Sequence, residues 1–391
     1  TGGLGSIGGA FFAALLIGLI HALGVSLFPQ ATLVLVFLTM AVVLAVRPQG
    51  LMGQPLDAGP REIIQKFHQP SVKRSLGALY FIAFFGLCAL AWTGGEYTRS
   101  LASDALILLI FGVSLQSMMA LGGLVSFGHA AFFGLGAYGA ALSHTQWGAS
   151  LPVALAAGCA LALAVAAVFG AAVVRSAGVY LAMLSLALAQ VIWATATQWV
   201  ALTGGDNGVI GLRLVSDDTR PLFFVLLVFI ASLSVAALSR LAGSTFGAAL
   251  QAVRDTPQRA AASGLPVHGI KYRIFVESAV LAGLAGGLAA AHKGAVFPSA
   301  ASVATSVDAL LVVLLGGVHQ LWGAAVGSAV LTWASAELGS SVAVLRDYWR
   351  GALGVFVMAI MVLSPSGLLG LLQRMKGARR AASPADPGGS R

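Results

Sequence analysis

Charged residues are scarce in this sequence. Asp, Glu, Lys and Arg make up only 9% of the 391 residues, whereas a soluble domain has about 25%. Hydrophobic residues make up 58%, and the mean hydropathy is +0.92. So few charges cannot cover a chain of this length with a water-facing surface, and most of that surface must therefore face lipid. The composition excludes a soluble globular fold and predicts a polytopic integral membrane protein.

Stretches of alternating polar and apolar residues are also absent, which argues against a membrane β-barrel. Long apolar stretches are present instead, of the length that a helix needs to cross about 30 Å of hydrocarbon. We predict an all-α transmembrane bundle with about ten core spans and an N-terminal two-span hairpin. The expected spans are 8–28, 31–46, 76–94, 104–124, 127–143, 151–174, 178–199, 222–240, 273–296, 306–318, 322–340 and 351–369. Segment 306–318 is too short to cross alone, so we expect a half-helix or part of a broken one.

Cysteine is nearly missing. The two cysteines, Cys88 and Cys159, both lie inside expected spans, where thiols usually pack as small hydrophobes. We therefore expect neither a disulfide framework nor a metal site. Segment 8–28 has no preceding basic region and no clear cleavage site, so we expect a membrane span there and not a signal peptide.

Motifs for nucleotide binding and catalysis are missing as well. No Walker A pattern GxxxxGK[ST] occurs, so we expect no nucleotide bound by such a loop. The patterns HExxH, CxxC and GxSxG are also absent. We predict no catalytic residue, no metal ligand and no cofactor bound by this chain, which counts against an integral membrane enzyme.

Acidic residues are expected to be rare at mid-membrane. Glu277, Asp308 and Glu337 lie near the ends of expected spans, whereas proton- or sodium-driven transporters usually keep ionisable groups at mid-membrane. The central polar residues are mostly neutral: Gln116, Gln190, Thr195 and Thr197. This pattern counts against a secondary transporter and predicts that any active transport draws its energy from another chain.

Basic residues are concentrated in segments 47–75 and 240–273 and in the C-terminal tail. The positive-inside rule predicts that all three are cytoplasmic, and it explains the net charge of +9 better than nucleic-acid binding does. Segment 200–221 holds three aspartates against two arginines and fits the opposite side.

The same features divide the chain into four parts. We expect a transmembrane hairpin over residues 1–46 and a polar cytoplasmic linker with four prolines over 47–75. Residues 76–370 form a single transmembrane domain, and residues 371–391 form a basic, disordered cytoplasmic tail.

The first segment that indicates a function runs from Gln116 to Tyr138. An apolar helix is expected to stop at Gly122-Gly123, before the next span begins. A break of this kind is tolerated in a membrane only where protein or a water-filled cavity covers it, so it faces a pathway or a packed interior. An alternative for His129 is that it only caps a helix end. The residues assigned to the substrate pathway here are Gln116, Ser126, Gly128, His129, Phe132 and Tyr138.

The second segment, Thr203 to Gly208, combines Gly-Gly with Asn-Gly, which predicts a tight external loop. Gly204, Gly205 and Asn207 would lie where a delivering partner docks or where the pathway closes. A plain connector is an equally good interpretation from the residues alone.

The third segment predicts a short cytoplasmic helix over 257–263. Thr256 can cap it, Pro257 fits its first position, and Gly264 fits its C-terminal stop. Its alanines favour a surface that another protein approaches closely, over a plain solvated loop. The residues expected to couple to that partner are Arg254, Asp255, Arg259, Ala260, Ala261 and Gly264.

With these segments, the core from about residue 76 to 370 resembles the LivM-type permeases of bacterial branched-chain amino acid ABC importers. Residues 126–134 are similar to the family's SxGHAAFFGxGAY signature, and residues 203–208 are similar to its TGGxNG loop. Residues 315–323 resemble its GGxGxxWG stretch, and residues 365–368 resemble its closing PxGL.

Two departures concern the expected ATPase contacts. Gln258 and Arg259 stand where the family often has Glu before the alanines of the coupling segment. Val318 and His319 follow the glycine pair where the family often has GGLG.

The resemblance implies a multi-pass permease of the bacterial inner membrane that imports branched-chain, hydrophobic amino acids. It implies three kinds of protein partner: a LivH-type second permease, two cytoplasmic ATPase subunits that use ATP, and a periplasmic substrate-binding protein. A permease for urea or a related small amide shares the same signatures and stays open as an alternative.

Overall fold

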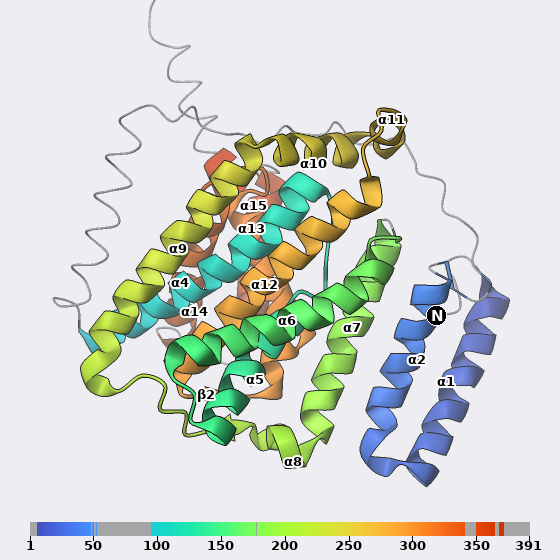
Figure 1. Cartoon of the computed structure of the whole chain (residues 1–391), viewed down its shortest axis with the longest axis horizontal. Helices are drawn as coiled ribbons and strands as arrows, with labels where there is room; N and C mark the ends of the chain where they lie inside the picture. Colours follow the sequence, from blue (N-terminus) through green and yellow to red (C-terminus); the bar gives the residue numbers. More distant parts are fainter. Residues whose placement is uncertain are drawn as a thin grey trace, which may run out of the picture.

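A computed structural model of the chain describes residues 6–47, 49–50, 52, 95–176, 178–340, 349–363 and 367–370. Most of this part is α-helical (Figure 1). The long helices are α1 (Ile7–Leu27), α2 (Thr32–Val46), α4 (Glu96–Gln116), α5 (Ala130–Trp147), α6 (Leu151–Val173), α7 (Val179–Gln198), α9 (Arg220–Gly243), α12 (Val267–Lys293), α13 (Val303–Gly316), α14 (Gly323–Ser340) and α15 (Trp349–Leu363).

Shorter elements connect these helices. They are the α-helices α8 (Val200–Thr203), α10 (Thr245–Asp255) and α11 (Pro257–Ala262), the 3₁₀ turns η1 (Pro29–Ala31), η3 (Gly205–Asn207), η4 (Asp217–Thr219) and η5 (Pro298–Ala301), and the π-helix η2 (Ser117–Leu121). The strands β1 (Val209–Ile210) and β2 (Ala295–Val296) pair antiparallel, with Val209 opposite Val296.

The predicted all-α membrane bundle is confirmed. Within the described residues, six helices are long and apolar enough to cross a membrane. They are Gly8–Leu27, Glu96–Leu121, Leu151–Val173, Val179–Gln198, Arg220–Gly243 and Val267–Lys293. The expected span 76–94, most of the linker 47–75 and the tail 371–391 lie outside the described residues.

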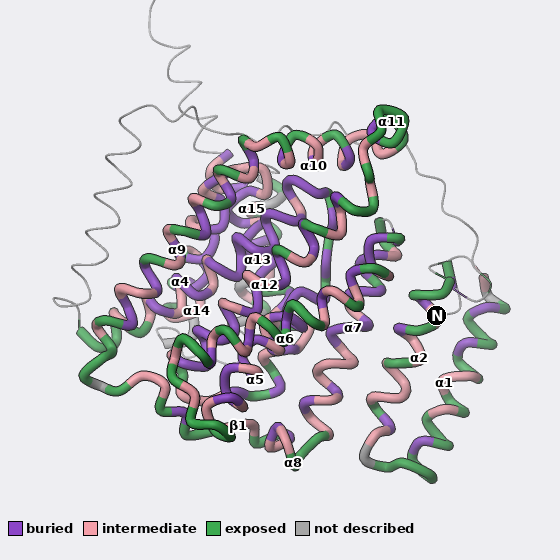
Figure 2. The backbone as a smooth tube through the Cα atoms, in the orientation of Figure 1, coloured by how far each residue is buried: buried purple, intermediate pink, exposed green. Residues whose placement is uncertain are grey.

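The centre of the bundle is built from α5, α6 and α12, which approach one another through glycines. A Cβ atom at Gly136 would lie 1.9 Å from the carbonyl oxygen of Gly283, so only glycine fits at that crossing. Small residues allow helix backbones to approach closely in lipid, where no hydrophobic effect drives helices together. The buried residues accordingly concentrate in this central part of the bundle (Figure 2).

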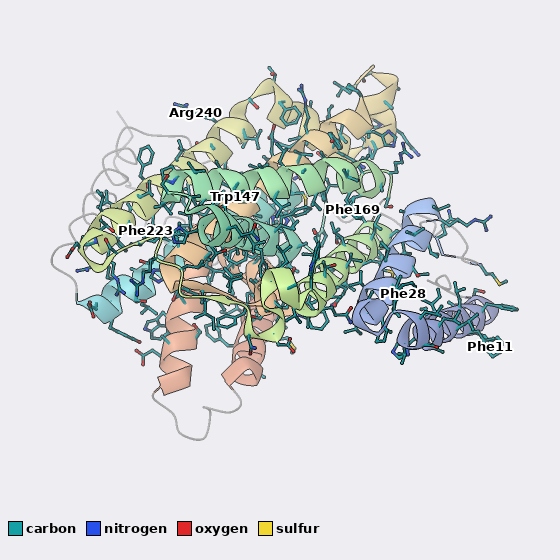
Figure 3. The ribbon with its side chains drawn as sticks, turned by 60° about the horizontal axis from the view of Figure 1, so that its bottom comes forward. Phe11, Phe28, Trp147, Phe169, Phe223 and Arg240 are labelled. Carbon is teal, nitrogen blue, oxygen red and sulfur yellow. The ribbon has the colours of Figure 1, made fainter. Side chains whose placement is uncertain are left out.

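The N-terminal hairpin of α1 and α2 lies beside the main bundle, next to α7 (Figure 1). Its side chains are largely apolar and exposed: Phe11 is 63% exposed and Phe28 is 64% exposed. Figure 3 shows Phe11 at the outer edge of this hairpin. Exposed apolar surface of this kind fits contact with lipid.

Helix α12 begins earlier than the sequence analysis predicts. It starts at Val267, directly after Pro266, so that Lys271 and Arg273 lie on its first turns and not in a loop. Long basic side chains can extend from such a position to the membrane surface. Glu277 therefore lies ten residues inside a helix of 27 residues, and its predicted position near a span end is wrong.

Helix α13 is short, as predicted for segment 306–318. Its 14 residues extend over about 21 Å, less than the ~30 Å of a hydrocarbon core. A tight turn at residues 317–322 leads into α14, which packs against α13. The chain thus folds back before α13 could cross the membrane.

Candidate functional site

The helix break predicted between residues 122 and 129 is present, and it is only partly covered by protein: Ser126, Gly128 and His129 are buried, whereas Val125 and Phe127 are exposed. Helix α4 continues as the π-helix η2, and regular helix resumes only at Ala130 in α5. The backbone N–H of Phe127 donates to Ser185 Oγ (3.1 Å), and that of Ala130 donates to Ser306 Oγ (2.9 Å). Side chains of α7 and α13 thus satisfy these two backbone N–H groups of the break. Its position at a pathway or in a packed interior stays a prediction.

Gly128 has no room for a side chain at this break. Its Cβ atom would lie 1.7 Å from the carbonyl oxygen of Ser185. Ser126 is fully buried next to it, and its Oγ accepts a hydrogen bond from the Gly128 N–H (3.3 Å). These two residues therefore hold the break against α7.

His129 is fully buried and joins the break to α4. Its Nε2 lies 2.8 Å from Ser114 Oγ, and its ring stacks on Phe111 with the centroids 5.6 Å apart. His129 occupies the N-cap position of α5, but its side chain makes no capping hydrogen bond. The imidazole thus connects the start of α5 to α4, and it does not cap α5 through its side chain.

Gln116 is also fully buried, at the end of α4. Its Nε2 donates to the carbonyl oxygens of Val318 (3.1 Å) and Gln320 (2.6 Å), and its Oε1 accepts from the Ala324 N–H (3.3 Å). A single side chain thereby holds the turn between α13 and α14. Its assignment to the substrate pathway stays a prediction.

Phe132 and Tyr138 lie on α5, on buried faces. Phe132 packs edge-on against Phe275 of α12, with the ring centroids 5.5 Å apart. Tyr138 packs in a small cluster with Leu212 and Val296, beneath the β1–β2 ribbon. Both side chains stabilise helix packing in this structure, and their contact with substrate stays a prediction.

The tight loop predicted at residues 203–208 is confirmed. Gly204 and Gly205 have φ angles of 77° and 61°, in the left-handed region that glycine adopts without strain. Thr203 Oγ1 donates to the carbonyl oxygen of Ala196 (2.6 Å), which ties the loop to α7. Asn207 is exposed at the end of η3. The loop lies at the end of the bundle opposite α10 and α11 (Figure 1).

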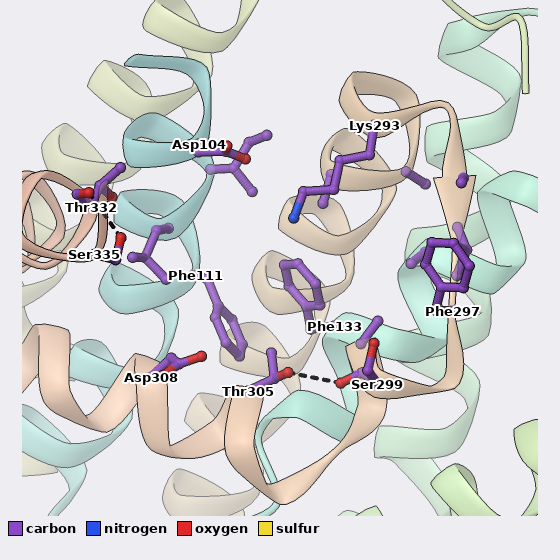
Figure 4. Close-up of a pocket in the computed structure, with 18 of the residues that line it drawn as sticks. Asp104, Phe111, Phe133, Lys293, Phe297, Ser299, Thr305, Asp308, Thr332 and Ser335 are labelled. Carbon is purple, nitrogen blue, oxygen red and sulfur yellow. Dashed lines mark hydrogen bonds between the residues drawn. The ribbon is translucent and has the colours of Figure 1, made fainter. Parts of the chain in front are cut away.

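A cavity of about 640 Å³ lies at the same end as this loop, between α4, α5, α12, α13 and α14. Such a volume is typical of a small-molecule site. Three charged side chains line it: Asp104 from α4, Lys293 from α12 and Asp308 from α13 (Figure 4). The serine and threonine residues of its wall are Ser299, Thr305, Thr332 and Ser335.

The floor of the cavity is apolar and its rim is aromatic. Phe111 is almost completely buried and contacts Phe133, with the ring centroids 4.7 Å apart. Tyr97, at 70% exposed, and Phe297, at 45% exposed, lie at the rim. Because Phe111 also stacks on the buried His129, the C-terminal side of the helix break contacts the floor.

The sequence analysis missed this cavity. None of the residues assigned to the pathway lines it, although Phe133 belongs to the same SxGHAAFF stretch. A signal was available, because charged residues in or at the ends of apolar spans commonly mark substrate pathways. Asp104, Lys293 and Asp308 are charged residues of this kind. The sequence analysis noted Asp308 only for its place near a span end.

Two helices, α10 and α11, lie across the other end of the bundle (Figure 1). The predicted helix 257–263 is confirmed as α11: Pro257 begins it, and Gly264 follows its end with a φ of 82°. Thr256 occupies the N-cap position, but its side chain accepts no capping hydrogen bond. Helix α10 was not predicted. It begins at the cap Ser244, whose Oγ accepts from the Gly247 N–H (3.0 Å).

The alanines of α11 do not share one face. Ala260 is only 4% exposed and packs against the bundle. Ala261, Arg259 and Gly264 are exposed. A surface for a partner on α11 therefore excludes Ala260.

Arg254 joins α10 to the end of α4. Its guanidinium donates to the carbonyl oxygen of Ala120 and to Asp255 Oδ1 (2.8 Å), and its side chain is only 9% exposed. Gly123 makes room for this contact, because its φ is 64° and a Cβ atom there would lie 2.5 Å from Arg254 Cγ. Burial and the positive charge of Arg254 lower the pKa of His319, in the turn between α13 and α14. Helices α4 and α10 and this turn thus meet around one arginine.

Comparison with known proteins identifies two relatives that align along most of the chain. The chain is 27% identical over 367 residues to the high-affinity branched-chain amino acid transport system permease protein LivM of Escherichia coli strain K12, covering 85% of this chain and 84% of that protein. It is 26% identical over 342 residues to LivM of Salmonella typhimurium strain LT2, covering 80% and 79%.

A more distant match covers only part of the chain. The xylose transport system permease protein XylH of Haemophilus influenzae strain Rd is 28% identical over 162 residues, covering 39% of this chain and 42% of XylH. No solved structure matches the chain significantly.

A match to a protein family covers more than half of the chain, from the start of α4 to the end of α15. It includes the helix break, the tight loop, the cavity and the two surface helices. Residues 97–364 place the chain in the family of permease components of branched-chain amino acid transport systems.

Proposed function

We propose that this chain is the transmembrane permease subunit of an inner-membrane ABC importer for branched-chain, hydrophobic amino acids. The observation that carries the proposal is the family match over residues 97–364, together with LivM relatives that align along most of both chains. Two features of the structure support the proposal: the cavity at one end could hold a substrate, and helices α10 and α11 at the other end could contact an ATPase.

The basic residues around α10 and α11 support a cytoplasmic position for that end. Segment 240–273 carries five Lys and Arg residues, and the positive-inside rule puts such segments in the cytoplasm. The cavity and the loop at residues 203–208 then face the periplasm, where a binding protein delivers substrate.

The ATPase would dock on the exposed residues of α11 and on α10. Arg254 links α10 to η2 and thus to α4, and α4 carries Asp104 and Phe111 of the cavity wall. A displacement of α10 by the ATPase would therefore move a helix that borders the cavity. Rigid-body movement of packed helices is a common way to switch a transporter between two states.

The complete importer would need three kinds of protein partner. We propose a LivH-type second permease, two ATPase subunits that use ATP, and a periplasmic binding protein, with membrane lipid around the bundle. This chain has no Walker A loop of its own, so ATP would be used by the partner subunits only.

A pull-down of the tagged chain from gently solubilised membranes tests this proposal. Mass spectrometry should identify an ATPase, a second permease and a binding protein, and a ligand screen on that binding protein should select leucine, isoleucine or valine. A binding protein that selects urea would replace the amino-acid assignment. Isolation of an active transporter without any ATPase would contradict the importer assignment.

A further inference from the structure

We infer that the cavity between α4, α12 and α13 binds the zwitterionic head and the aliphatic side chain of an amino acid on its way through the permease. The inference rests on the proposed function and deepens it, because it selects among the substrates that related permeases carry. It assigns recognition to residues of this chain in addition to the binding protein.

The apolar part of the cavity fits an aliphatic side chain. Phe111 and Phe133 form a tilted aromatic pair at 4.7 Å, and Ile107 and Leu108 continue the apolar wall along α4. Burying an aliphatic side chain against this wall is favourable because it removes apolar surface from water. The floor is therefore suited to leucine, isoleucine or valine.

The charged part of the cavity fits the two charges of an amino acid. Figure 4 shows the Lys293 amine pointing from the end of α12 into the cavity, between the α4 wall with Asp104 and the α13 wall with Asp308. A cation can bind the α-carboxylate, and the facing carboxylates can bind the α-ammonium group. Charge-assisted hydrogen bonds of this kind are about twice as strong as neutral ones.

The pairing of opposite charges distinguishes this ligand from its competitors. Urea carries no net charge at either end, and a sugar such as the xylose carried by the relative XylH is neutral as well. Neither ligand would pair with Lys293 and Asp104 together, and a ligand that covers a charged group without pairing it loses the hydrogen bonds that this group made to water. The charges and the apolar floor together therefore select a zwitterion with a hydrocarbon side chain.

Two contacts hold the cavity walls that carry Asp104 and Asp308. Asp104 Oδ1 lies 3.9 Å from His292 Nε2, and Thr305 Oγ1 donates to the carbonyl oxygen of Ser299 (2.8 Å). These contacts hold the α4 and η5–α13 walls at the cavity. Phe111 lies two turns further along α4 than Asp104, so that the head and the side chain of one amino acid can reach both.

The first test is photolabelling of the complete importer, reconstituted with its ATPases and binding protein. A diazirine analogue of leucine should label peptides that contain Phe111, Phe133 or residues 293–308. A tenfold excess of leucine should suppress this labelling, whereas the same excess of urea should not. Labelling that leucine does not suppress, or labelling confined to other segments, would overturn the inference.

The second test is ATP-driven leucine uptake by variants of the same complex. Removing a partner of a charge-assisted hydrogen bond lowers binding by about tenfold or more. We expect Lys293→Ala and Asp104→Asn to lower leucine uptake by about that factor. The variant Lys293→Arg keeps the charge and should stay within about threefold of the wild type.

The matched control is Arg213→Ala, which removes an exposed cation at the same end of the bundle but outside the cavity. It should leave uptake unchanged. Full uptake by Lys293→Ala, with equal amounts of complex in the membrane, would overturn the inference while the proposed function stands. Failure of the wild-type complex to take up leucine, isoleucine or valine would instead contradict the proposed function.

Discussion

The two ends of this bundle are built in opposite ways. At the cavity end, Asp104 is 44% exposed and Lys293 is exposed, so these charges remain accessible to a solute. At the other end, Arg254 and Gln116 are buried and bonded to backbone carbonyls of neighbouring elements. The accessible end can bind and release a solute, whereas the end with bonded side chains can transmit a movement of α10 to α4. Helix α4 belongs to both ends, and the buried Ser114–His129 contact lies between them.

Replacing Gly136 by Ala should have the largest effect, because it separates the helices that hold the two ends together. The new Cβ atom would lie 1.9 Å from the Gly283 carbonyl oxygen, which exceeds the overpacking that usually costs about 1–3 kcal/mol. We expect loss of folded protein, measured by size-exclusion chromatography of the solubilised chain. The control Gly18→Ala has open space around its Cβ and should behave as the wild type. A monodisperse, thermally stable Gly136→Ala protein would contradict this account of the centre.

The variant Ala261→Trp should abolish coupling while the membrane bundle still folds. Ala261 is exposed on α11, so the indole blocks the approach of an ATPase without entering the core. We expect uptake to disappear, with either ATPase binding lost or ATP hydrolysis no longer linked to uptake. Arg259→Ala should do less, because exposed ion pairs contribute only about 0.2–1 kcal/mol.

Ala260→Trp sharpens this prediction, since Ala260 is buried against the bundle. It should reduce the amount of folded protein, which Ala261→Trp should not. Full uptake by Ala261→Trp would show that α11 is not the docking helix, and the coupling assignment would be withdrawn.

Arg254→Ala should have an intermediate effect, because it weakens the link between α10 and α4. Loss of a hydrogen bond from a charged group costs about 1.5–3 kcal/mol, which corresponds to about tenfold or more. We expect uptake to fall by about that factor while ATP hydrolysis continues, measured on the same proteoliposomes. The variant Arg254→Lys keeps the charge but loses the planar guanidinium, so its uptake should lie between that of the wild type and that of Arg254→Ala. An Arg254→Ala complex with normal uptake would mean that α4 does not receive the displacement through this contact.

Replacing His319 should have the smallest effect, and this effect should appear in the pH dependence of stability. Burial and Arg254 lower its pKa below the ordinary value of 6.5, so the folded chain binds fewer protons than the unfolded chain. Stability should therefore decline as the pH falls below about 6.5. In His319→Gln this part of the decline should be absent, as measured by thermal unfolding between pH 7 and pH 5. An unchanged profile would show that His319 does not contribute to it.

Local features of the fold could be predicted from the sequence. Pro257 and Gly264 predicted the ends of α11, and Gly204 and Gly205 predicted the tight loop, because proline restricts φ to a helical value and glycine allows a positive φ. Helix α10 was missed, although Ser244 and the spacing of Leu250 and Val253 were available as signals. The early start of α12 was missed because basic residues within a helix resemble a loop in composition.

The candidate site was harder to predict than the fold. The cavity is formed by five helices that are distant in sequence, and no local pattern reports which of their faces meet. Arg254 was expected to contact an ATPase, whereas its side chain points into the bundle because Gly123 leaves space for it. Gln116 was selected as a central polar residue, and only the structure reveals that the turn at 317–322 engages its amide.

The most direct test of the account is uptake of radiolabelled leucine into proteoliposomes that contain the complete importer. ATP is enclosed in the lumen, and the binding protein is added outside together with leucine. We predict uptake that requires both ATP and the binding protein, and that an imposed proton or sodium gradient cannot replace ATP. Uptake that continues without ATP, or that a cation gradient drives, would contradict the assignment of this chain to an ATP-driven importer.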